Sequence, residues 1–92
     1  MYVVEFTSTF KKELKKAERR GKDMRKMREI ITLLCSGDTV PEQYRDHALK
    51  GRFSGYRECH IEPDWLLMYA RDEDRLLLFL TRTGTHADLF GR

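Results

Sequence analysis

Three histidines, one carboxylate and one arginine in the second half of the chain are the residues best suited to chemistry. The histidines are His47, His60 and His86, the carboxylate is Asp64 and the arginine is Arg82. Histidine exchanges protons near neutral pH, and arginine binds phosphate oxygens through a planar fork of donors. Each residue alone has an ordinary structural explanation, but together they suit acid–base chemistry on a phosphate group.

Three strands are expected to position these residues. Residues 56–62 alternate between two faces, and one face carries the polar residues Glu58, His60 and Glu62. Residues 65–70 are wholly apolar, which is typical of an interior strand. Residues 71–75 predict a charged hairpin loop, and the next strand then covers residues 76–81.

The register of this second hairpin decides which residues meet. If the first and last residues of the 71–75 loop pair with each other, Asp64 lies opposite Arg82. The same end of the sheet is then expected to gather five polar residues, namely His60, Glu62, Asp64, Arg82 and His86. His47 belongs to a long loop over residues 38–52, and the register does not place it. A loop of that length in a small domain is often functional.

A metal site is the competing interpretation of the same residues. His60 and Asp64, with His47 or His86, could supply three or four ligands. The sequence contains no HxH, HExxH or paired-cysteine spacing, and Arg82 would bring positive charge to the position of the cation. These features favour chemistry without a metal or another cofactor. Neither a GxSxG nucleophile elbow nor a Gly-rich phosphate loop is present.

The remaining elements complete an α+β fold. The 92 residues provide for one domain, residues 1–92. Residues 2–6 predict a first strand, two helices follow it, and Thr85 with Asp88 resembles the capping box of a last helical turn. The order β-α-α-β-β-β predicts a helical hairpin packed on one face of a small, mainly antiparallel four-stranded sheet.

Charge is concentrated on the two helices. The net charge is +3, but residues 10–28 hold ten basic and three acidic residues. The first helix has a thin apolar stripe and a broad basic face, formed by Lys11, Lys12, Lys15, Lys16, Arg19 and Arg20. Such a face is the electrostatic footprint of a polyanion binder, although a solvated helix surface explains the same pattern.

Neither export nor a membrane span is expected. The longest apolar run, Trp65 to Ala70, is far shorter than the ~20 residues that a membrane helix needs. No signal peptide is visible, so a cytoplasmic protein is expected, with no membrane partner. The two cysteines, Cys35 and Cys59, belong to no CxxC and are expected to be reduced.

Three segments carry a resemblance to a known family. They are Asp46–Gly51, Gly55–Trp65 and Arg82–Gly91. With the order of elements, they resemble the YafQ branch of the RelE superfamily, the toxins of bacterial type II toxin–antitoxin modules. The resemblance implies a RelE-like fold and an endoribonuclease that cuts mRNA on the ribosome, and a cognate antitoxin that silences it. Matched by motif, the functional positions would be His47, His60, Asp64, Trp65, Arg82, His86 and Phe90.

The expected mechanism uses these positions without metal. His60 or His47 takes the proton of a ribose 2′-OH, and His86 protonates the leaving 5′-oxygen. Arg82 offers its fork to the phosphate, and Asp64 orients a histidine or raises its pKa. Trp65 and Phe90 support the site or stack on a base. The basic helix face docks on ribosomal RNA or receives an acidic antitoxin segment.

Three alternatives remain open at this point. The chain could be a non-catalytic module that binds nucleic acid or a partner protein. It could be a gyrase-directed relative, because the superfamily contains such toxins on the same fold. A metallohydrolase that uses the His/Asp cluster is the third alternative.

Overall fold

A computed structural model describes residues 1–91 of the chain. The elements follow one another in the order β1 (Val3–Phe6), α1 (Ser8–Arg19), α2 (Met24–Ser36), η1 (Glu42–Tyr44), β2 (His47–Ala48), η2 (Gly51–Phe53), β3 (Arg57–Glu62), β4 (Trp65–Asp72), β5 (Leu77–Gly84) and α3 (His86–Phe90), where η marks a 3-10 turn. The predicted α+β fold is confirmed. No helix among the described residues has the length and apolar character needed to cross a membrane.

Local signals in the sequence begin and end the helices. The Thr7 hydroxyl accepts a hydrogen bond from the Phe10 amide at 2.9 Å, which caps α1. The Asp23 carboxylate caps α2 through the Arg25 amide at 3.0 Å. Gly37 ends α2 with φ +82°, a conformation that glycine adopts without a steric penalty.

The sheet has five strands in the order β1-β5-β4-β3-β2. β1 runs parallel to β5, and the other neighbours are antiparallel. The prediction of four strands was wrong by one, because β2 is only two residues long. A two-residue strand shows no alternation, so the sequence assigned it to the 38–52 loop, which also contains η1 and η2.

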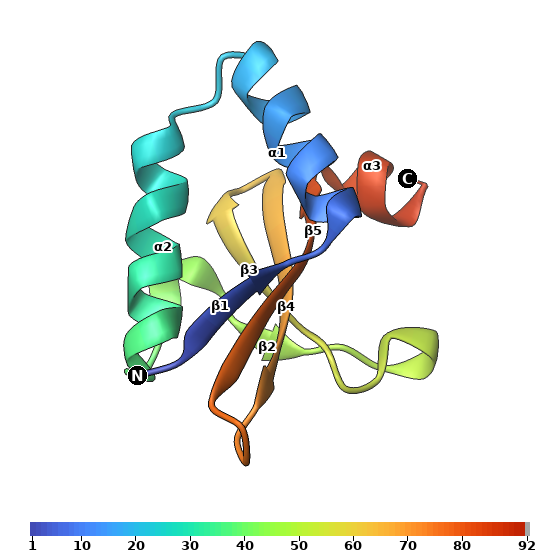
Figure 1. The fold of residues 1–92 in the computed structure, drawn as a ribbon. Helices are drawn as coiled ribbons and strands as arrows, with labels where there is room; N and C mark the ends of the chain where they lie inside the picture. Colours follow the sequence, from blue (N-terminus) through green and yellow to red (C-terminus); the bar gives the residue numbers. More distant parts are fainter. Residues whose placement is uncertain (92) are drawn as a thin grey trace.

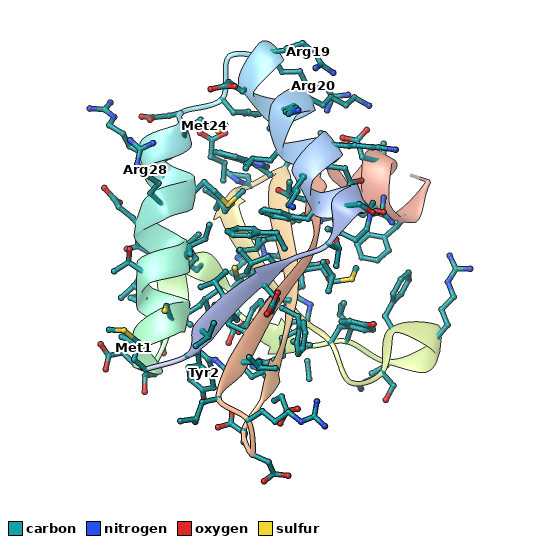
Figure 2. All side chains as sticks on the ribbon, viewed as in Figure 1. Met1, Tyr2, Arg19, Arg20, Met24 and Arg28 are labelled. Atoms are coloured by element: carbon teal, nitrogen blue, oxygen red, sulfur yellow. The ribbon has the colours of Figure 1, made fainter. Side chains whose placement is uncertain are left out.

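Helices α1 and α2 cover one face of the sheet, and the core lies between these layers (Figure 1). Phe10, Ile30 and Leu34 of the helices are fully buried. They pack against the inward side chains of the central strands, which are Cys59, Ile61, Trp65, Leu67, Tyr69, Leu78 and Leu80. Figure 2 shows side chains filling the space between the helices and the sheet. We call the side of the sheet that α1 and α2 do not cover the open face.

The pairing of β4 with β5 differs from the predicted register. Arg82 lies opposite Met68, and Leu66 lies opposite Gly84, so Asp64 is not opposite Arg82. Two features explain the difference. β4 continues to Asp72, beyond the expected loop start, and a bulge between Met68 and Tyr69 shifts the register.

Cross-strand pairs arrange the open face in rows. The first row joins His60, Leu66 and Gly84, and the second joins His47, Glu58, Met68 and Arg82. In the third row Ala70 lies opposite Phe79, and the β3–β4 register carried one residue further places Tyr56 beside Ala70. These rows position the candidate site.

Candidate active site

The three histidines gather on the open face, although they come from different elements. His47 lies on β2, His60 on β3 and His86 at the start of α3. The ring centroid of His60 is 6.1 Å from that of His47 and 5.6 Å from that of His86. The structure therefore brings all three predicted histidines together, with His60 in the middle.

A buried carboxylate, that of Glu58, lies between two of these rings. Its Oε1 is 3.6 Å from His47 Nε2 and 3.8 Å from His60 Nε2, and Glu58 is only 4% exposed. A carboxylate in this position stabilises the charge that either imidazole gains with a proton. The alternation of residues 56–62 predicts that Glu58 and His60 share a face, but it does not indicate a role for Glu58 in the site.

Burial holds His60 in its neutral form. Desolvation lowers the pKa of His60 below its usual value of 6.5, and the nearby His86 and His47 rings lower it further. The charge of Glu58 opposes this shift in part. His60 Nδ1 is buried and forms no hydrogen bond with any residue of the described chain. A neutral imidazole on an open face is suited to accept a proton.

Asp64 fixes the orientation of His86. Its Oδ1 accepts hydrogen bonds from the backbone amide of His86 at 2.8 Å and from the ring Nδ1 at 2.6 Å. Both hydrogen bonds lower the pKa of Asp64 below its usual value, and the bond from the backbone amide has the larger effect. Because a carboxylate only accepts, Nδ1 carries a proton and Nε2 is left to act on a substrate.

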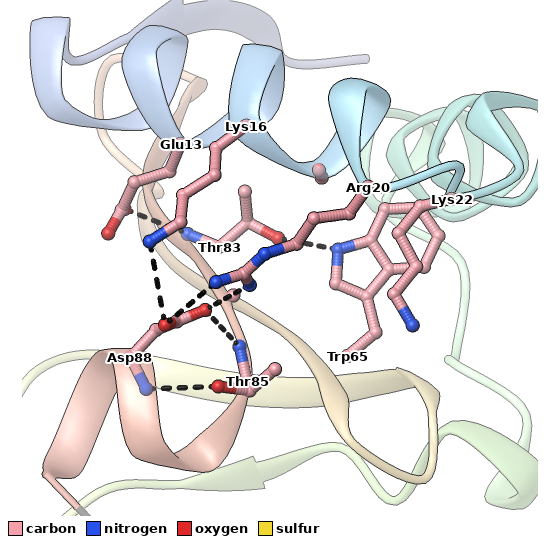
Figure 3. A pocket seen from close by; sticks show the side chains of 10 residues that line it. Glu13, Lys16, Arg20, Lys22, Trp65, Thr83, Thr85 and Asp88 are labelled. Carbon is pink, nitrogen blue, oxygen red and sulfur yellow. Dashed lines mark hydrogen bonds and ion pairs between the residues drawn. The ribbon is translucent and has the colours of Figure 1, made fainter.

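The helix that carries His86 is itself anchored to α1. Asp88 completes a capping box with Thr85, which confirms that prediction, and Arg20 Nη1 binds Asp88 Oδ2 at 2.7 Å (Figure 3). Lys16 Nζ lies 3.8 Å from Asp88 Oδ1. The Arg20 hydrogen bond is the largest cause that lowers the pKa of Asp88. A side chain on Gly84 would meet Asp88 Cβ at 2.9 Å, so glycine permits this close approach.

The guanidinium of Arg82 is bound by a residue that the sequence did not indicate. Its Nε and Nη2 bind Glu13 of α1 at 2.9 and 2.7 Å, and Glu13 Oε1 also accepts from the Thr83 amide at 3.2 Å. This bidentate pair occupies the edge of the fork that was expected to face a phosphate. Among residues 1–91, Nη1 of Arg82 makes no hydrogen bond.

Two residues of the expected set lie elsewhere. Glu62 binds Lys22 and Lys26 of the helical layer at 3.2 and 2.8 Å, because β3 is irregular between His60 and Glu62. Its predicted place beside His60 was therefore wrong. Trp65 is 1% exposed, and its Nε1 donates to Thr83 Oγ1 at 3.1 Å. A buried ring cannot stack on RNA, so Trp65 acts as a core residue behind the site.

Phe90 joins α3 to the loop that follows β2. Its ring meets Phe53 of η2 edge-on, with the centroids 5.6 Å apart. The guanidinium of Arg52 lies 5.0 Å from the centroid of Phe53. The loop and α3 therefore border the histidine cluster together.

One known protein family matches nearly the whole chain. A family model described as the bacterial toxin of type II toxin–antitoxin systems, YafQ, matches residues 2–91. The chain belongs to the YafQ family. The membership confirms the resemblance found in the sequence and the predicted class of protein, an endoribonuclease toxin of a type II toxin–antitoxin module.

Individual YafQ relatives are similar over nearly the whole chain. The mRNA interferase toxin YafQ of Escherichia coli K12 is 46% identical over 89 residues, which are 96% of this chain and 95% of the relative. A putative toxin YafQ of Haemophilus influenzae is 57% identical over a shorter alignment of 30 residues, which covers 33% of this chain and 29% of that protein.

Solved YafQ structures share the fold. One is the crystal structure of the E. coli DinJ–YafQ complex, which aligns with a TM-score of 0.91 and 42% identity. The alignment covers 99% of this chain and 100% of the chain in that structure. A metal-bound toxin from Helicobacter pylori is 36% identical with a TM-score of 0.92, and the alignment covers 98% of this chain and 100% of that one.

Proposed function

We propose that this chain cleaves mRNA on the ribosome by acid–base catalysis, without metal in the chemical step. One observation carries the proposal: a half-buried histidine with a lowered pKa lies 5.6 Å from a second histidine that a carboxylate orients. Two imidazoles at that spacing can act on opposite sides of one phosphate, one as a base and the other as an acid.

The reaction follows from these two roles. His60 removes the proton of a ribose 2′-OH, and the oxygen attacks the adjacent phosphorus. The bond from phosphorus to the 5′-oxygen breaks. His86 enters this step as the imidazolium, with Nδ1–H bound to Asp64, and gives its Nε2 proton to the leaving oxygen. The products are a 2′,3′-cyclic phosphate and a 5′-hydroxyl. Glu58 stabilises the imidazolium that forms on His60, since its carboxylate lies 3.8 Å away.

Two further residues support this reaction in the proposal. Arg82 contributes Nη1 to the phosphate, because Glu13 holds the other edge of its fork. His47 is the alternative base. It is more exposed than His60 and lies at a similar distance, 3.6 Å, from Glu58.

The partners in this proposal are the ribosome and a cognate antitoxin. Four residues of the basic face of α1 are not involved in anchoring α3 and are available for ribosomal RNA, namely Lys11, Lys12, Lys15 and Arg19. The E. coli YafQ has been solved in complex with DinJ, and we expect an equivalent antitoxin to bind this chain.

The test is a message with a single 2′-deoxy substitution at the cut site, bound to ribosomes. Binding should persist, because phosphate contacts dominate affinity, and cleavage should stop. Cleavage of the unsubstituted message should leave a 2′,3′-cyclic phosphate. A 5′-phosphate product, or cleavage of the deoxy message, would contradict the mechanism. Arrested DNA supercoiling with normal translation would indicate a gyrase-directed toxin instead.

A metal ion is a second candidate ligand of the same cluster. One donor atom from each of Glu58, His60 and His86 lies within 4.8 Å of the other two. Two imidazoles and a carboxylate suit zinc or copper, and related H. pylori toxins have been solved in metal-bound and copper-bound forms. Coordination would occupy the lone pairs that the acid–base reaction uses, so we expect inhibition. Added Cu²⁺ should stop cleavage, and a chelator should restore it; a metallohydrolase would show the opposite response.

A further inference from the structure

A second hollow of the open face lies beside the histidine cluster and takes no part in the chemistry above. Its volume is about 470 Å³. Tyr56, Ala70 and Phe79 line it, together with the small or polar residues Thr7, Ser54, Gly55 and Thr81. Tyr56 is 36% exposed, so part of its ring is accessible to a partner.

The hollow lies on the same face of the sheet as the candidate site. Tyr56, Ala70 and Phe79 form the third row of the open face. The second row, which contains Glu58, Met68 and Arg82, lies between the hollow and the first row, which contains His60. Side chains on one face of a strand repeat every two residues, about 7 Å. The hollow therefore begins one step beyond Glu58. The loop that supplies Ser54 and Tyr56 also supplies Phe53, which contacts Phe90 of α3.

The chemistry of the hollow favours a base over a phosphate. None of the described residues that line it is charged. Glu5 of β1 lies next to Phe79 in the parallel pair, and its carboxylate would repel a phosphate. The same carboxylate can accept a hydrogen bond from an amino group on a base edge.

The spacing of the strands suits one flat ring. Tyr56 and Phe79 lie on either side of β4, and neighbouring strands are about 4.8 Å apart, so their backbones are separated by nearly 10 Å. Between them Ala70 has a small side chain. A ring that stacks at about 3.5–4.0 Å from each aromatic surface fits such a gap. Protein recognition of unpaired RNA commonly uses stacking on aromatic side chains.

We propose that this hollow binds the nucleobase of a nucleotide that flanks the cut, and that Tyr56 and Phe79 determine which base is preferred there. The inference rests on the proposed function, because it requires RNA across the histidine cluster. An apolar segment of an antitoxin is the other possible occupant. It is less favoured, since the hollow adjoins the row of Glu58 and is bordered by the loop that contacts α3.

The experiment compares Phe79→Ser with Leu76→Ser. Leu76 is 48% exposed in the β4–β5 hairpin and serves as the matched control. Ribosome-bound messages that differ by one base at each position around the cut are cleaved, and the rates are compared. We expect one position near the cut to respond to Phe79→Ser. Messages with the preferred base at that position should be cleaved about 5- to 150-fold more slowly, and messages with another base there should lose less. Phe79→Trp should keep the preference, and Tyr56→Ser should weaken it at the same position.

The outcomes separate this inference from the proposed function. An unchanged base preference in Phe79→Ser and Tyr56→Ser, with melting temperatures near that of the parent chain, would overturn the inference. Weaker antitoxin binding with unchanged cleavage would also overturn it and identify an antitoxin contact. The proposed function depends instead on the 2′-OH and on the cyclic product, which neither variant alters.

Discussion

Asp64 Oδ1 binds His86 at two atoms, the backbone amide at 2.8 Å and the ring Nδ1 at 2.6 Å. Both side chains are largely exposed to solvent, so this contact contributes little to the free energy of folding. Its main effect is to fix the ring orientation and the protonated nitrogen of His86. An exposed pair that fixes a tautomer indicates a role in catalysis rather than in stability.

Asp64→Asn should therefore lower cleavage far more than it lowers the melting temperature. The amide oxygen can still accept one of the two hydrogen bonds, but its NH₂ group can turn toward the ring and favour the wrong tautomer. We expect a fall in rate of about 10²–10⁴-fold for His86→Ala and a smaller fall for Asp64→Asn. Thermal melts and single-turnover cleavage on the same preparation measure both. A large loss of stability with retained cleavage would make His86 structural.

Glu58→Gln should move the acid limb of the pH–rate profile. Burial lowers the pKa of His60, and the charge of Glu58 raises it in part. Removal of that charge lowers the pKa further, so His60 stays neutral to lower pH. The fall in single-turnover rate on the acid side should then occur at a lower pH. The maximal rate should also be lower, because the His60 imidazolium is less stabilised without the charge of Glu58. Glu62→Gln, whose carboxylate binds Lys22 and Lys26, is the control and should leave the limb unchanged.

Arg20→Gln should reduce cleavage through the position of α3. Arg20 binds Asp88, which closes the capping box of the helix that carries His86. A displacement of about 1 Å at a catalytic group can cost about 10²-fold in rate, so we expect a loss of up to that size in the chemical step. Ribosome binding should change little. Arg19→Gln, which changes the neighbouring exposed residue, is the control, and its chemical step should proceed at the parent rate. Equal losses in both variants would assign the effect to the charge of α1 instead.

The sequence predicted what local signals determine. The capping box of Thr85 with Asp88 depends on a few adjacent residues, and it is present in the structure. Contacts between distant residues were missed. Arg82 and Glu13 are 69 positions apart, and their pairing depends on how α1 lies over β5. No spacing rule links two such residues.

Register and burial account for the other differences. The extension of β4 to Asp72 and the bulge at Met68/Tyr69 together move Arg82 from its expected place opposite Asp64, and the irregularity after His60 turns Glu62 toward Lys22 and Lys26. Bulges have weak sequence signals, and a shift of one residue reverses the face of each following side chain. Glu58 lies on the face that the alternation of β3 predicts, but alternation alone does not show that its carboxylate is buried. Its contact with His60 lies within β3, but its contact with His47 depends on the pairing of β2 with β3.

Charge reversal of Lys11, Lys15 and Arg19 should weaken ribosome binding and flatten its salt dependence. These side chains lie on α1 outside the contacts with Asp88, so their reversal leaves the anchoring of α3 by Lys16 and Arg20 in place. Each phosphate contact that is lost removes roughly one unit from the slope of log K against log salt concentration. Single-turnover cleavage at saturating ribosome should keep the parent rate, because the histidine cluster is unchanged. If binding is unaffected at every salt concentration, this face of α1 is a solvated surface, and the ribosome must contact the toxin through another part of the molecule.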